Sequence, residues 1–280
     1  MLDINTLIIL VPYAILVGIV FSAIGAAGGI LTSFGLITLF GVLDPNAVKP
    51  MTQLVVLAAA LVFVPGYVRR REVVLPLGLL LGAGGLVGAY IGSTLSSRYL
   101  SDMATFRPVF GVLTLAVAAQ IIWKLTRPKA VASAPLGKCT GINDTAIGMD
   151  GLRFSYCERA YKIPLWSPLL AGLIIAMIAA VFGVGGGFLL VPYMATILTM
   201  PMHIIPATAA IAIFMSLAVS ISNFVRLGAP LEWNMLVPMI IGVAIGALIG
   251  PMVNKRMKNA WLQGILAVIV IGIGLKYTLF

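Results

Sequence analysis

The chain has 280 residues, of which 61% are apolar and only 9% are charged, and its mean hydropathy is +1.13. Because about 25% of the residues of an ordinary soluble domain are charged, this composition excludes a soluble enzyme, a disordered chain and a disulfide-rich secreted scaffold. The net charge is +10, which in a membrane protein reflects basic cytoplasmic loops and gives no reason to expect nucleic-acid binding.

Uncharged stretches dominate the chain. Seven of them, 16 to 63 residues long, contain no Asp, Glu, Lys or Arg and do not alternate in hydrophobicity as barrel strands do. Since a spanning helix needs about 20 apolar residues, they predict a helical membrane bundle. In chain order the predicted segments are residues 7–24, 28–42, 51–68, 73–95, 108–123, 165–182, 186–200, 204–225, 233–254 and 260–277. The second and the seventh are short for a crossing and are expected to be half-helices or re-entrant pieces.

The one long polar segment, residues 125–164, is interpreted as a cytoplasmic linker between a first transmembrane repeat (1–124) and a second (165–280). It is too short to be an independent domain. Its two cysteines, Cys139 and Cys157, are separated by 17 residues with no histidine nearby. This is not a zinc spacing, so we expect neither a metal nor a cofactor.

The two halves carry matching motifs in the same order. Residues 25–31 correspond to 183–189, Pro50–Thr52 to Pro206–Thr208, and Gly88–Gly92 to Gly246–Gly250, at offsets of 156 to 158 residues. The predicted fold is an all-α polytopic membrane protein with two homologous repeats of about five segments each. Five crossings per half would invert the second repeat and put 13 of 18 basic residues on the linker side. Four crossings would make the repeats parallel and put 12 there, so inversion is favoured only slightly.

Two glycine clusters interrupt long apolar stretches. The first consists of Gly25, Gly28 and Gly29, and the second of Gly183, Gly185, Gly186 and Gly187. Close helix packing accounts for spaced glycines, but consecutive glycines also free the backbone to leave helical geometry. Non-helical backbone at membrane depth is tolerated where it lines a cavity, and a helix that starts there directs N–H groups toward it. The two clusters therefore predict an anion-binding site made of broken helices.

Few polar residues lie within the predicted segments. Those assigned to the same site are Thr52, Gln53, Thr208, Ser216 and Asn223, of which Ser216 and Asn223 share a helix face. An amide offers two donors to an anion, although interhelical hydrogen bonding is an alternative role for the serines and for Asn223. Paired acids and multi-ligand metal sets are missing from the predicted segments, so we do not expect an enzyme.

The duplicated glycine cluster, the Pro-x-Thr that follows it and the later Gly-Ala-x-Ile-Gly resemble the sulfite exporter TauE/SafE family of membrane transporters. The resemblance covers residues 10–125 and 165–278, and it is stronger in the second half, through Gly183–Pro192 and Pro206–Thr208. The first half departs from the pattern, with Phe34 in the place of Pro192. The resemblance implies transport of sulfur-containing anions such as sulfite, thiosulfate and organosulfonates.

Together these observations predict a multi-pass protein of the cell membrane that is a secondary transporter of a small anion. Its expected partners are the anion and the lipid bilayer, without nucleic acid, and self-association into a homo-oligomer stays open. The resemblance favours a sulfur oxyanion or an organosulfonate as the substrate, moved by alternating access between the two repeats. An anion channel and a non-transporting membrane scaffold subunit remain the alternatives.

Overall fold

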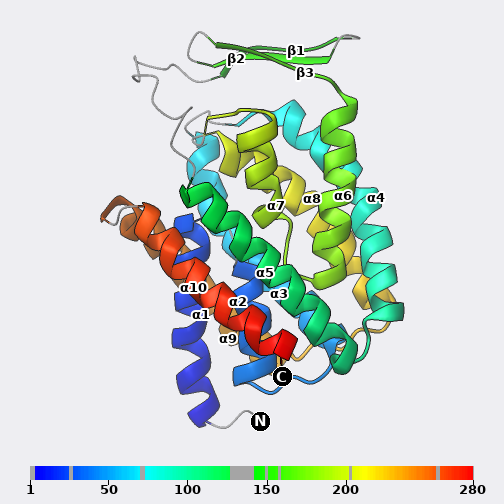
Figure 1. Cartoon of the computed structure of the whole chain (residues 1–280), viewed down its shortest axis with the longest axis vertical. Helices are drawn as coiled ribbons and strands as arrows, with labels where there is room; N and C mark the ends of the chain where they lie inside the picture. The colour runs from blue at the N-terminus through cyan, green and yellow to red at the C-terminus, as the bar shows by residue number, and fades with distance from the viewer. Residues whose placement is uncertain are drawn as a thin grey trace.

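The protein is a helical bundle with a small β-sheet at one end, as the computed structural model shows (Figure 1). The structure describes residues 4–24, 28–69, 73–126, 142–148, 151–156, 159–201, 204–256 and 259–279. The first half contains α1 (Ile4–Ile24), α2 (Gly28–Phe34), the π-helix η1 (Gly35–Leu39), α3 (Pro45–Arg69), α4 (Leu75–Tyr99) and α5 (Met103–Thr126). The second half contains α6 (Trp166–Phe182), α7 (Gly187–Pro192), the π-helix η2 (Tyr193–Ile197), α8 (Ile205–Arg226), α9 (Trp233–Arg256) and α10 (Asn259–Leu279).

Six helices of the described chain, α1, α3, α4, α5, α8 and α9, are long and apolar enough to cross a membrane by length and composition. The continuous segments α2–η1 and α7–η2 are shorter, at residues 28–39 and 187–197. The prediction of a mostly helical, polytopic membrane protein is confirmed, and the two segments expected to be short are short.

Two helices begin earlier than the sequence predicted. α3 starts at Pro45 and not at residue 51, and α5 starts at Met103 and not at residue 108. Pro50 therefore lies inside α3, near its start. Pro50 is the sixth residue of α3, so its missing N–H leaves the Asn46 carbonyl without its i+4 donor, yet the helix continues through it. The earlier starts bring Lys49 and Arg107 into helices.

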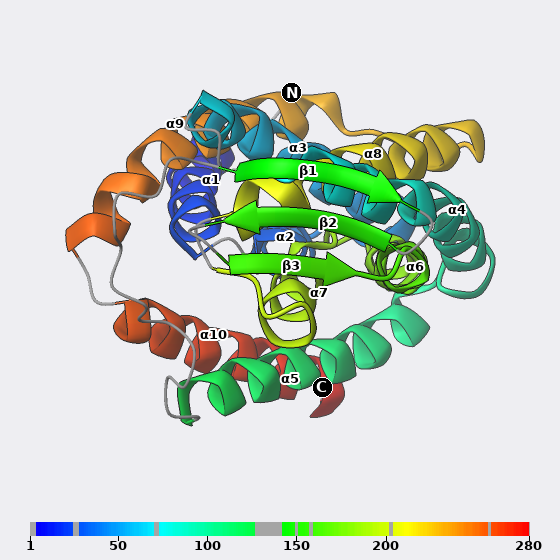
Figure 2. The same ribbon diagram turned by 90° about the horizontal axis from the view of Figure 1, so that it is seen from above.

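Helices from the two halves pack closely on one another. α1 contacts α9, α4 contacts α6 and α8, α3 contacts α8 and α9, and α5 pairs with α10. Gly88 of α4 lies against the backbone of Leu173 in α6, and Gly246 of α9 lies against the backbone of Ile15 in α1. These spaced glycines allow close helix contact. Seen from above, α2 and α7 lie between the α5–α10 pair and the remaining helices (Figure 2).

The segment expected to be a linker holds a three-stranded antiparallel sheet that the sequence analysis did not predict. Its strands β1 (Ile142–Gly148), β2 (Gly151–Tyr156) and β3 (Arg159–Ile163) are neighbours in chain order. The sheet lies across one end of the bundle, over α2 and α7 (Figure 2).

One face of this sheet is buried. In β2 the buried Leu152, Phe154 and Tyr156 alternate with less buried residues, as expected for a half-buried strand. The rings of Phe154 and Tyr161, which face each other across the β2–β3 pair, stack with centroids 4.9 Å apart. The buried side chains belong to the same hydrophobic cluster as the helices, so the sheet is packed on the bundle.

Candidate functional site

The two glycine clusters meet at the centre of the bundle. α6 ends at Phe182 and is capped by Gly183, and both Gly183 (φ +72°) and Gly185 (φ +74°) adopt left-handed backbone conformations that favour glycine. Gly29, in the first turn of α2, packs against the backbone of Val184 between them. A side chain at Gly29 would overlap the Val184 carbonyl, so the sequence prediction that these positions need glycine has a physical basis here.

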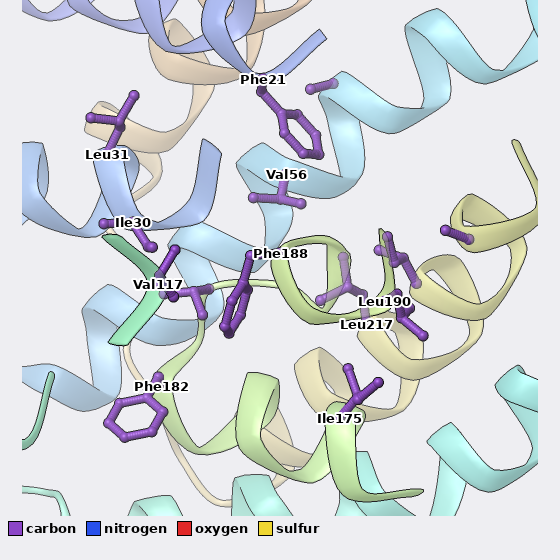
Figure 3. Close-up of a cluster of buried hydrophobic side chains, with 14 of the residues drawn as sticks. Phe21, Ile30, Leu31, Val56, Val117, Ile175, Phe182, Phe188, Leu190 and Leu217 are labelled. Carbon is purple, nitrogen blue, oxygen red and sulfur yellow. The ribbon is translucent and has the colours of Figure 1, made fainter. Parts of the chain in front are cut away.

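Large apolar side chains surround this meeting point. Figure 3 shows Ile30 of α2, Val117 of α5 and Phe188 of α7 gathered beside Val56 of α3. All four are buried. Polar atoms close to the break are therefore held in an apolar environment, where each needs a hydrogen-bond partner.

The second glycine cluster lies along one face of α3. A Cβ atom at Gly183 would lie 2.6 Å from the Cα atom of Lys49, and one at Gly185 would lie 3.0 Å from Cγ1 of Val56. Lys49, Gln53 and Val56 have the spacing i, i+4, i+7 and share a helix face. Gln53 is thus on the face of α3 that lies against the break, between its two contacts.

Gln53 is fully buried, and neither its Nε2 nor its Oε1 atom has a hydrogen-bond partner in the part of the chain that the structure describes. Most buried polar side chains are paired, so an unpaired amide at this position requires an explanation. The neighbouring Thr52 is also fully buried, and its hydroxyl lies 3.0 Å from that of Ser33 in α2. Two hydroxyl groups and an amide are therefore present beside the glycine break.

Ser216 of α8 is joined to the second cluster by a small cavity. Ser216 and Gly186 both line a space of about 10 Å³ among α4, α6, α7 and α8, which is no larger than one water molecule needs. The Ser216 hydroxyl also donates to the carbonyl of Ile213 at 3.0 Å. Gly186 itself has φ −76°, and a Cβ atom there would make ordinary contacts, so this position does not require glycine.

The other two predicted residues of α8 lie away from the glycine clusters. Thr208, near the start of α8, accepts a hydrogen bond from the Val74 N–H at 3.0 Å and donates to the Ile204 carbonyl at 2.7 Å. Asn223 is fifteen residues further on, which is about 22 Å along the helix. One small anion cannot contact both ends of α8 together.

The amide nitrogen of Asn223 is occupied by α4. Nδ2 donates to the hydroxyls of Ser93 at 2.7 Å and Thr94 at 2.9 Å, and lies 3.5 Å from the Tyr90 carbonyl. This arrangement matches the interhelical role that the sequence analysis left open. The site predicted from the sequence thus divides into a central group and two distant members. The central group consists of Gly28, Gly29, Thr52, Gln53, Gly183, Gly185, Gly186, Gly187 and Ser216.

Three positions of the sequence analysis lie outside the described residues: Gly25 of the first cluster, and the linker cysteines Cys139 and Cys157. Within the described ranges, no group of three or more His, Cys, Asp and Glu side chains is arranged to hold a metal ion.

Lys49 is the residue that the sequence analysis missed. It fell just outside the predicted segment 51–68, whereas the structure buries it completely inside α3, beneath Gly183. The i, i+4 spacing of Lys49 and Gln53 could have indicated that Lys49 belongs to the site. It puts both side chains on one helix face if the helix continues through Pro50.

Comparison with known proteins agrees with this architecture. The chain is 24% identical to the Probable membrane transporter protein YunE of Bacillus subtilis (strain 168), over 95% of each chain. No solved structure gives a significant match. The family model described as Sulfite exporter TauE/SafE matches residues 10–277, nearly the whole chain. The chain therefore belongs to the sulfite exporter TauE/SafE family of membrane transporters and is a multi-pass membrane protein.

Proposed function

We propose that this chain is a secondary transporter of a small anion, a sulfur oxyanion or an organosulfonate, that works by alternating access between two inverted repeats. Membership of the family supports the transport class, and the family's description supports sulfite as the first substrate to test. The proposal involves no catalytic step.

The observation that carries the proposal is the buried, unpaired amide of Gln53 beside the glycine break. Burying an amide without a partner costs free energy, and an oxyanion leaving water needs several hydrogen bonds to replace its hydration. Both costs are reduced if the anion accepts hydrogen bonds from Nε2 of Gln53 and from the adjacent Thr52 hydroxyl, although Oε1 of Gln53 gains no partner from an anion. Neutral donors of this kind suit a substrate that must bind and then leave again.

The contacts between helices support two halves related by a two-fold axis, which an inverted repeat provides. If α1–α5 correspond to α6–α10 in order, the contact of α1 with α9 has its counterpart in α6 with α4, and α3 with α9 in α8 with α4. The pairs α3–α8 and α5–α10 each join corresponding helices. Such a pattern is expected when a two-fold axis relates the halves, and rocking of one half against the other exposes a central site alternately to each side.

Flux of labelled sulfite into vesicles reconstituted with the purified protein tests the proposal. We expect saturable flux that methanesulfonate inhibits. Flux that rises linearly with concentration would indicate a channel, and no flux of any sulfur anion would indicate a scaffold subunit. Gln53→Leu should reduce the flux at least about 10-fold, because it removes a hydrogen bond to a charged group. Gln120→Leu removes a half-buried amide of α5, a helix that contributes no residue to the proposed site, so it is the matched control and should leave the flux unchanged.

A further inference from the structure

We propose that Lys49 supplies the positive charge of the anion site, and that it exchanges a backbone carbonyl of α4 for a substrate oxygen when the anion binds. This inference rests on the proposed function, and it adds a binding residue to the same site. It starts from the position of Lys49, which is fully buried and one helical turn, about 6 Å, from Gln53 on the same face of α3. Gly183 covers its backbone and the start of its side chain.

Among the described residues, the oxygen atoms that the Lys49 amine contacts belong to uncharged groups. Nζ donates to the carbonyl of Leu100 at 2.6 Å and lies 3.4 Å from the carbonyl of Ser96 and 3.5 Å from Oδ1 of Asn46. It also lies over the ring of Phe106, 5.1 Å from its centroid. The Lys49 amine thus lies at the C-terminal end of α4, where free carbonyl groups attract a cation.

The acidic group that acts on Lys49 electrostatically is Asp44. Its Oδ1 atom accepts the N–H of Asn46 at 2.8 Å at the start of α3. Among the described residues Asp44 attracts Lys49 but forms no ion pair with it, so the ammonium group, held by oxygen atoms of uncharged groups and a ring, has no directly bonded countercharge. Ionisable residues in membrane segments are expensive and mark substrate or ion pathways.

An anion beside Gln53 would provide that countercharge. The lysine side chain is flexible and its ammonium group has three donors, so a turn toward Gln53 can replace the Leu100 carbonyl with an anionic oxygen. The exchange would also release α3 from the end of α4. Binding of the anion would then be coupled to loosening of the bundle at the end opposite the sheet, which alternating access requires. The ligand class is a small oxyanion whose oxygen atoms can reach both Lys49 and Gln53, such as sulfite or a short sulfonate.

The first test compares affinities for methanesulfonate, measured by calorimetry on purified protein in detergent. Lys49→Met should weaken binding at least about 10-fold, because it removes a charge-assisted hydrogen bond. Lys49→Arg, which keeps the charge and the donors, should bind within about 3-fold of the wild type. Lys276→Met removes an exposed lysine of α10 and is the control for net charge; it should bind as the wild type does. A folded Lys49→Met protein with wild-type affinity would overturn the assignment.

The second test needs no variant, so it tests the role of Lys49 in anion binding even if Lys49→Met does not fold. A binding residue must be reachable from water in one state of the transport cycle, so acetic anhydride should acylate Lys49 in the wild-type protein. Saturating methanesulfonate should slow this reaction at least about 5-fold while the acylation of Lys276 is unchanged, as read by peptide mass spectrometry. Equal rates with and without the anion, or no acylation of Lys49 in either sample, would overturn the proposal. If the wild type neither binds nor transports any sulfur anion, the proposed function itself has failed.

Discussion

Gly29 of α2 packs against the carbonyl group of Val184, so the backbone of one glycine cluster touches the backbone of the other. A methyl group at Gly29 would overlap that carbonyl, whereas one at Gly186 would lie 3.5 Å from Cδ1 of Leu190, an ordinary contact. Gly29→Ala should therefore destabilise the protein by about 1–3 kcal/mol, as overpacking does, and Gly186→Ala should have little effect. Thermal unfolding in detergent measures both. Equal melting temperatures for the two variants would contradict this contact.

The duplicated glycine motifs allowed much of the centre to be predicted. Glycines such as Gly29 and Gly183 cannot carry side chains where two backbones meet, so their positions are visible in the sequence. The ends of α8 could not be assigned in the same way. Ser216 and Asn223 share a face, but positions two turns apart on one face can contact different neighbouring helices. The sequence does not say which helix each residue contacts. Lys49 was missed because the segment was predicted to start at residue 51, whereas α3 starts at Pro45 and continues through Pro50.

The sheet was missed for a different reason. Residues 125–164 were judged by their polarity, although Leu152, Phe154 and Tyr156 alternate with polar residues in the period of a half-buried strand. The apolar side chains of this face are buried against the bundle. A three-stranded sheet of this size needs such packing against other elements to be stable.

Asn223 should be a structural residue. Because its amide nitrogen already donates to Ser93 and Thr94, Asn223→Leu leaves two buried or half-buried hydroxyls of α4 without this donor. We expect a loss of about 1–3 kcal/mol in stability and an affinity for sulfite within about 2-fold of the wild type. Thermal unfolding and calorimetry on the same preparation separate the two effects. A large loss of affinity at an unchanged melting temperature would return Asn223 to the binding site.

The linker should lie in the cytoplasm, because seven basic residues fall between Lys124 and Lys162. In a Cys157→Ser background, a membrane-impermeant thiol reagent should fail to label Cys139 in intact cells and should label it after lysis. The control is Ser101→Cys in a protein without native cysteines. Ser101 is exposed between α4 and α5, at the end of the bundle away from the sheet, and should be labelled in intact cells. The reverse pattern would invert the orientation of the whole chain.

Gln53→Leu should make the ligand-free protein more stable while it weakens anion binding. In the described part of the chain the amide has no hydrogen-bond partner, so its burial costs about 1–3 kcal/mol that a leucine of similar size avoids. The wild type should recover this cost when an anion binds: sulfite at 100 times its dissociation constant should stabilise it by about 2.7 kcal/mol. In Gln53→Leu the melting temperature without sulfite should rise, and the shift that the same sulfite concentration produces should fall by about half or more. Gln120→Leu should alter neither quantity. A lower melting temperature with a full sulfite shift would mean that Gln53 holds the helices together and that the anion binds elsewhere.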